Sequence, residues 1–123
     1  MLLLADTSVW IDHFRRGDVE LAYYLEANMI LMHPFVRGEL ALGSIKDRLE
    51  KIRLMRDLEE VMIPTTDEVD VLIEREGLFG RGIGYVDAHL VASVKLTPDA
   101  LLWTRDKRLR SVADQFGIAA PIG

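Results

Sequence analysis

Short runs of apolar residues alternate with longer amphipathic stretches along the whole chain. The apolar runs are too short for helices and are typical of strands that a parallel sheet buries on both faces. They occupy residues 2–5, 29–33, 61–63 and 100–104, and residues 118–122 (IAAPI) are a candidate edge strand. Apolar residues at helical spacing predict helices over residues 8–15, 18–27, 34–43, 46–60, 66–78, 85–96 and 106–116. This alternation predicts an α/β fold with a parallel sheet and helices on both of its faces.

Several element ends carry local signals. Pro34 suits the first position of a helix, and Gly117 suits the end of the last one. The glycine-rich segment 77–84 (GLFGRGIG) is predicted to be a loop. The segment 46–60 shows a strong amphipathic pattern. Its apolar positions are Leu49, Ile52, Met55 and Leu58.

The composition narrows the class of protein. With 123 residues, half of them hydrophobic, the chain is predicted to be a single domain over residues 1–123. No stretch approaches the roughly 20 apolar residues of a membrane span, and the lack of cysteine excludes disulfides and thiolate metal sites. The start has no basic region like that of a signal peptide, so a cytoplasmic protein is expected. The net charge of −5 argues against non-specific nucleic-acid binding, although Arg15, Arg16 and the segment 105–110 are locally basic.

Two acidic residues follow predicted strands. Asp6 comes directly after residues 2–5, and Asp106 comes just after residues 100–104. In open parallel sheets, ligands bind outside the carboxyl ends of the strands, which is where both carboxylates are expected. Each residue alone is equally explained as the N-cap of the following helix.

Two further carboxylates stand in apolar helical segments. Glu39 lies in FVRGELALG, and Asp87 lies in GYVDAHLVASV. A buried carboxylate is costly unless it is paired or binds a metal. The alternative for each is a solvated stripe, or a partner such as Arg37 or Arg81.

Taken together, the four carboxylates predict a cation site. Like charges at one edge repel, so their convergence is expected only around a positive ion, and an all-oxygen ligand set favours Mg²⁺ or Mn²⁺. Such an ion activates water and stabilises charge on phosphate, which points to phosphodiester hydrolysis. The hydroxyls of Thr7, Ser8 and Thr104 are placed to orient water or phosphate, or to cap helices. The three histidines have no zinc-ligand spacing, and neither a phosphate-binding GxxxxGK[ST] loop nor a strand-linked GxGxxG segment is present.

Four blocks of the sequence resemble VapC-type PIN-domain proteins, in the family's order and spacing. They are DTSVWIDHF (6–14), GELALGSI (38–45), GIGYVDAHLVAS (82–93) and LLWTRDKRL (101–109). The resemblance implies a three-layer α/β/α sandwich with a short parallel sheet. It also implies a Mg²⁺- or Mn²⁺-dependent endoribonuclease that acts as the toxin of a VapBC-type toxin–antitoxin module. A cognate VapB-like antitoxin and a homodimer follow from the same resemblance.

The resemblance also assigns site residues. The family's acids correspond to Asp6, Glu39, Asp87 and Asp106, and its supporting polar residues to Thr7 and Thr104. Where some relatives carry a further acid, this chain has Lys107, Arg108, Leu109 and Arg110. One tightly held ion, with a second recruited by substrate phosphate, is therefore expected. Arg105 and Lys107 are expected to contact RNA phosphates, and an apolar groove over residues 8–27 and 46–58 is expected to receive the antitoxin.

Three other interpretations fit the sequence less well. A PIN-like binding module without catalysis is disfavoured because all four acids are present. A phosphoacceptor receiver domain needs an Asp after a central strand, but residues 61–63 are followed by Pro64 and Thr65. A phosphatase with a nucleophilic Asp needs Asp-x-Asp, and Ser8 occupies the second position.

Overall fold

A four-stranded, all-parallel sheet forms the centre of the computed structural model, which describes residues 1–123. Its strand order is β3-β2-β1-β4. The strands are β1 (Leu2–Ala5), β2 (Ile30–Met32), β3 (Glu59–Glu60) and β4 (Ala100–Trp103). β1 pairs with β4 along its whole length, from Leu2 opposite Ala100 to Ala5 opposite Trp103. The first and last strands of the chain are therefore neighbours, with β1 inside the sheet and β4 at the end of the strand order opposite β3.

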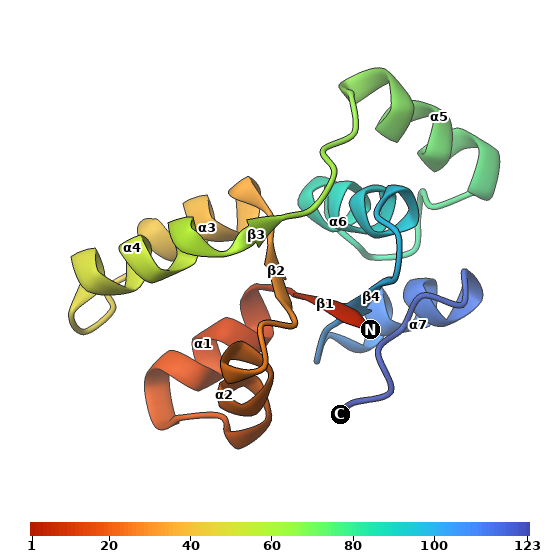
Figure 1. Ribbon diagram of the computed structural model, residues 1–123. Coiled ribbons are helices and arrows are strands. Elements are labelled where there is room, and N and C mark those ends of the chain that lie inside the picture. Colours follow the sequence, from red (N-terminus) through yellow and green to blue (C-terminus); the bar gives the residue numbers. More distant parts are fainter.

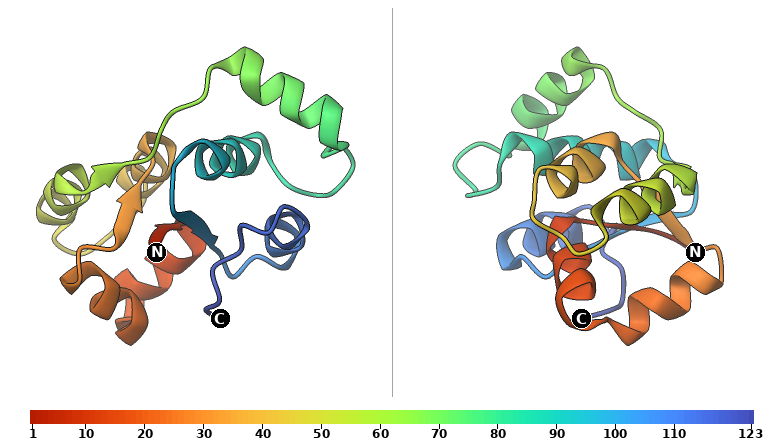
Figure 2. Two further views of the ribbon diagram at one scale, coloured as in Figure 1. Left: turned by 45° about the vertical axis from the view of Figure 1, so that its right-hand side comes forward. Right: turned by 90° about the vertical axis from the view of Figure 1, so that its left-hand side faces the viewer.

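Seven helices surround this sheet. They are α1 (Thr7–Arg16), α2 (Val19–Glu26), α3 (Pro34–Ala41), α4 (Arg48–Asp57), α5 (Thr66–Glu76), α6 (Tyr85–Leu96) and α7 (Lys107–Gln115). In every view, α1 and α2 lie below β1 and β4 while α6 lies above them, and α5 is the outermost helix beyond α6 (Figures 1 and 2). This arrangement confirms the predicted α/β/α sandwich. None of the helices combines the length and apolar character needed to span a membrane.

The core explains why the strands appear as unbroken apolar runs. Leu3, Leu4 and Ala5 of β1 are fully buried because helices cover both faces of the sheet. Trp10 of α1 and Trp103 of β4 are the largest fully buried side chains. Each large apolar side chain removed from water contributes roughly 1.5–3 kcal/mol, so these central residues are a main source of stability.

The third strand is not where its apolar run predicted it. The structure places β3 at Glu59–Glu60, which pair with Leu31 and Met32, whereas the prediction was 61–63. Of that run only Val61 is buried, and Met62 and Ile63 are about half exposed. The physical reason is that β3 is an edge strand that pairs only with β2. An edge strand need not be buried, so the backbone of two exposed glutamates can make this pairing.

The helix before β3 is correspondingly shorter than predicted. α4 ends at Asp57 instead of residue 60, because the chain must extend there to pair with β2. Met55 is buried, but Leu49 is 71% exposed and so does not belong to the core face. At the other end of the chain, residues 118–122 form only an isolated bridge between Ala119 and Leu102 instead of an edge strand.

His33 joins β2 to α3 and is completely buried. Its Nδ1 accepts a hydrogen bond from the backbone N–H of Phe35 (2.9 Å), which caps α3. Its Nε2 has no protein partner, and the ring lies 6.4 Å from that of His89. Burial, reinforced by the neighbouring His89, lowers the pKa of His33 to about 4. The neutral imidazole is therefore the folded form.

Protonation of His33 should weaken the fold below neutral pH. A depressed histidine pKa contributes stability that is fully present above the ordinary value of 6.5 and is lost as pH falls towards about 4. Over that window the loss is about 3 kcal/mol. His33→Asn keeps a capping side chain without the titration, so its unfolding free energy should fall less between pH 7 and pH 4. Urea unfolding of both proteins at several pH values measures this, and parallel pH curves would contradict it.

Candidate active site

Four carboxylates line one hollow at the carboxyl edge of the sheet. The hollow has a volume of about 430 Å³. Asp6 follows β1, Asp106 follows β4, Glu39 comes from α3, and Asp87 comes from the first turn of α6. Thr7 also lines it. The fold thus brings together four acids that are separated by up to a hundred positions in the sequence.

Asp6 is buried and both of its oxygens accept hydrogen bonds. Oδ1 accepts from the backbone N–H of Ser8 (3.0 Å) and from its hydroxyl (2.5 Å), which makes Asp6 the N-cap of α1. Oδ2 accepts from the hydroxyl of Thr104. The capping role and the place in the hollow therefore coexist, and together they fix the orientation of this carboxylate.

Thr104 connects the two acids that follow strands. Its hydroxyl donates to Asp6 and accepts from the backbone N–H of Asp106 (3.0 Å). Asp106 in turn caps α7, since its Oδ1 accepts from the N–H groups of Arg108 (2.9 Å) and Leu109 (3.0 Å). The Oδ2 atom of Asp106 makes no hydrogen bond within the protein, so it is available to a ligand.

Glu39 is exposed, which corrects the expectation that its apolar neighbours bury it. On α3, Val36 and Leu40 face the core, and the turn of the helix directs the adjacent position outwards. The Thr7 hydroxyl donates to Glu39 Oε1 (3.3 Å). Arg37, considered as a partner for Glu39, pairs instead with Glu60 (3.1 Å).

Asp87 is half-buried and feels the other three acids. Its Oδ2 accepts from the backbone N–H of Gly84 (3.1 Å) at the start of α6. Burial raises the pKa of Asp87, and the charges of Asp6, Asp106 and Glu39 add to this, while the Gly84 bond opposes it. Arg81, the alternative partner, bonds to Gln115 instead. Burial and the three neighbouring acids therefore destabilise the charge of Asp87, as expected beside a site that attracts a cation.

The donor chemistry of the hollow fits a hard divalent cation. All of its charged groups are carboxylates, and the chain has no cysteine. No three acidic or histidine side chains form a ready-made group that binds one ion directly. A Mg²⁺-like ion usually keeps several of its waters and takes only one or two direct carboxylates, which agrees with this open arrangement.

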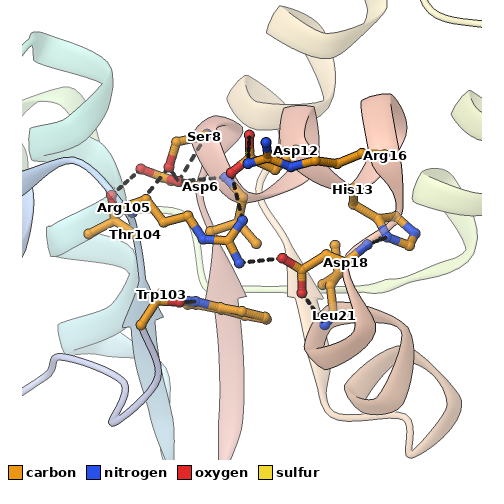
Figure 3. A network of polar contacts seen from close by, with 12 residues as sticks. Asp6, Ser8, Asp12, His13, Arg16, Asp18, Leu21, Trp103, Thr104 and Arg105 are labelled. Carbon is orange, nitrogen blue, oxygen red and sulfur yellow. Dashed lines mark hydrogen bonds and ion pairs between the residues drawn. The ribbon is translucent and has the colours of Figure 1, made fainter.

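The two predicted phosphate contacts lie in different surroundings. The Arg105 guanidinium forms ion pairs with Asp12 (2.7 Å) and Asp18 (Figure 3). Lys107 is exposed and has no ion pair. Asp12 and Asp18 were not predicted as partners of Arg105, since no local signal in the sequence distinguishes them from solvated helix residues.

Known proteins with similar sequences identify the family of this chain. Residues 3–115 match the PIN domain family. The chain is also similar to Ribonuclease VapC32 of Mycobacterium tuberculosis, from the strains CDC 1551 / Oshkosh and ATCC 25618 / H37Rv. In both cases it is 47% identical over 118 residues, which cover 96% of this chain and 95% of the relative. Because the family match runs from the first strand into the last helix and includes all four acidic positions of the hollow, this chain belongs to the PIN domain family.

Proposed function

We propose that this chain is a metal-dependent endoribonuclease that acts as the toxin of a VapBC-type module, as a single cytoplasmic domain. The observation that carries the proposal is the convergence of Asp6, Glu39, Asp87 and Asp106 in one hollow. The similarity to a relative named as a ribonuclease supports RNA as the substrate.

Asp6, Asp87 and Asp106 would hold Mg²⁺ or Mn²⁺, partly through water, with Glu39 as a further ligand. When bound, such an ion supplies a water of lowered pKa and stabilises negative charge on the phosphate. Two features of the chain suit such an ion. Ser8 and Thr104 fix the Asp6 carboxylate by hydrogen bonds, and Asp106 Oδ2 makes no hydrogen bond within the protein.

Glu39 is the acid best placed to handle water. It is the exposed carboxylate of α3, and the Thr7 hydroxyl bonds to one of its oxygens. We assign Glu39 the orientation of the attacking water. In-line attack forms the bond from water oxygen to phosphorus and breaks the bond to the 3′ oxygen, which takes up a proton. The products are a 5′-phosphate and a 3′-hydroxyl.

A VapB-like antitoxin is the proposed protein partner. A second hollow of about 190 Å³ adjoins the acidic one and shares Thr7 and Glu39 with it. Its walls include Ile11 and Phe14 of α1 and Ile45 before α4. An apolar antitoxin segment bound there would lie beside the acids, where an arginine of the partner pairs well with carboxylates. A homodimer is proposed on the resemblance to VapC proteins.

Neutralising Asp87 should separate stability from activity. Its raised pKa means that the charged form is penalised in the folded state, and this penalty grows as pH rises through the folded pKa. Asp87→Asn should therefore leave the metal-free protein as stable or more stable at pH 7, with no gain below about pH 4. It should also reduce the rise in melting temperature caused by Mn²⁺ and abolish cleavage of single-stranded RNA.

The matched control for this experiment is Asp57→Asn, an exposed carboxylate at the end of α4. It should keep both the Mn²⁺ effect and cleavage. Full Mn²⁺ stabilisation and full cleavage in Asp87→Asn would reject the metal site. A wild-type protein that binds Mn²⁺ but cleaves no RNA would favour the non-catalytic binding module.

Removing one free cation should weaken RNA binding in a salt-dependent way. Lys107 is exposed, unpaired and next to Asp106. If it contacts one phosphate, Lys107→Ala should lower the slope of log K against log salt by about one. Arg75→Ala, on the distant α5, is the control and should leave the slope unchanged. Fluorescence anisotropy of labelled RNA over a salt series measures this, and equal slopes for Lys107→Ala and wild type would exclude the contact.

Growth of a bacterial host tests the toxin role. Expression of the wild-type chain should slow growth, and co-expression of the proposed VapB-like antitoxin should restore growth. Asp87→Asn should be harmless at the same protein level, because toxicity requires cleavage. Normal growth with abundant, folded wild-type protein would count against the toxin role while leaving nuclease activity to be measured in vitro.

A further inference from the structure

Asp6 and Asp106 lie where the backbone hydrogen bonds between the β1 and β4 segments end. The last backbone bond between their segments runs from the Asp6 N–H to the Trp103 carbonyl (2.9 Å). Beyond that point the segment after β1 continues into α1 and the segment after β4 continues into α7. Only side-chain contacts can then hold the two segments relative to each other. Ser8, Thr104 and Arg105 provide the contacts there.

Arg105 joins the segment after β4 to the helices after β1. One nitrogen of its guanidinium pairs with Asp12 of α1 (2.7 Å), and the other pairs with Asp18 at the start of α2. Only 14% of the Asp18 side chain and 25% of the Arg105 side chain are exposed. The guanidinium also lies over the ring of Trp103, 5.7 Å from its centre. Figure 3 shows this cluster on the side of α1 next to β4.

The same residue reaches the acidic site through its backbone. The N–H of Arg105 donates to the Ser8 hydroxyl (3.2 Å), which itself donates to Asp6 (2.5 Å). Asp106 is the next residue along the chain. Any displacement of Arg105 is therefore passed on to one acid through Ser8 and to the other through the backbone.

The charges of the cluster are already balanced within the protein. Burial acts to raise the pKa of Asp18, but the Leu21 N–H and Arg105 outweigh it and hold that pKa below its ordinary value. Burial likewise acts against the charge of Arg105, and the two carboxylates reverse this and raise its pKa. Arg16 also pairs with Asp12 (3.4 Å), so two arginines face two carboxylates. The charge of the Arg105 guanidinium is therefore already compensated within the protein and is not free for an RNA phosphate.

We propose that Arg105 is a positioning residue of the proposed nuclease site. It clamps the start of α7 against α1 and α2, and so sets the placement of Asp6 relative to Asp106. This inference rests on the proposed function. It replaces the expectation that Arg105 contacts RNA phosphate, and it assigns Asp12 and Asp18 to the same task.

Two variants from opposite sides of the clamp provide the test. Arg105→Gln removes the cation, and the double variant Asp12→Asn/Asp18→Asn removes its partners while keeping an amide that still caps α2. Both should lower kcat roughly 10- to 100-fold, the range for residues that support metal ligands, with RNA affinity and its salt slope unchanged. Arg105→Lys should restore only part of the rate, because an ammonium group lacks the planar fork that reaches two carboxylates.

The double variant distinguishes the two roles of Arg105. If Arg105 bound phosphate, freeing it from its acids would tighten RNA binding and preserve cleavage. That result would overturn the proposal, as would an Arg105→Gln protein with unchanged kcat, weaker RNA binding and a smaller salt slope. Arg75→Ala, on α5 and outside the proposed site, is the control and should leave kcat, RNA affinity and the salt slope unchanged.

Two further measurements distinguish a positioning role of Arg105 from a loss of folding and from a failure of the proposed nuclease function. Melting temperatures show whether each variant folds. If the double variant does not fold, the single variant Asp12→Asn, which keeps the ion pair between Arg105 and Asp18, replaces it. Mn²⁺ affinity, measured by calorimetry without RNA, should fall roughly tenfold in Arg105→Gln and stay the same in Asp57→Asn. Unchanged Mn²⁺ affinity and kcat in a folded Arg105→Gln protein would reject the clamp. A wild-type protein that binds Mn²⁺ without cleaving RNA would reject the proposed function alone.

Discussion

The parallel pairing of β1 with β4 is the constraint on which the rest of this structure depends. It places the first strand beside the last, so that the segments after Ala5 and Trp103 leave the sheet together. Asp6 and Asp106 then lie at one edge, and each caps the helix that it begins. The fold thus uses the same carboxylates to start two helices and to line the hollow.

Holding four like charges at one edge works against stability, and hydrogen bonds offset part of that cost. The hydroxyls of Ser8 and Thr104 donate to Asp6, and the backbone N–H of Gly84 donates to Asp87. These donors hold the carboxylates in place but do not remove the repulsion. The pKa of Asp87 stays raised, first by burial and then by the charges of Asp6, Asp106 and Glu39. A cation relieves the repulsion directly, which is why metal binding and stability should be linked in this protein.

The distribution of cations limits how an acidic protein can bind RNA. Arg105, Arg37 and Arg110 are all engaged with carboxylates, so the sequence overstates the positive charge available near the site. Lys107 remains exposed and free of ion pairs beside Asp106. With a net charge of −5, substrate affinity must depend on a few such residues and on a bound cation.

The sequence by itself determined the features that depend on local pattern. The apolar runs located β1, β2 and β4, helical spacing located the helices, and position after a strand singled out Asp6 and Asp106. Only the tertiary structure decided the features that depend on distant partners. β3 forms at Glu59–Glu60 because β2 offers it an edge, and Glu39 is exposed because of how α3 packs. The partners of Arg105 lie 93 and 87 positions away, and no local pattern records a contact made across the sheet.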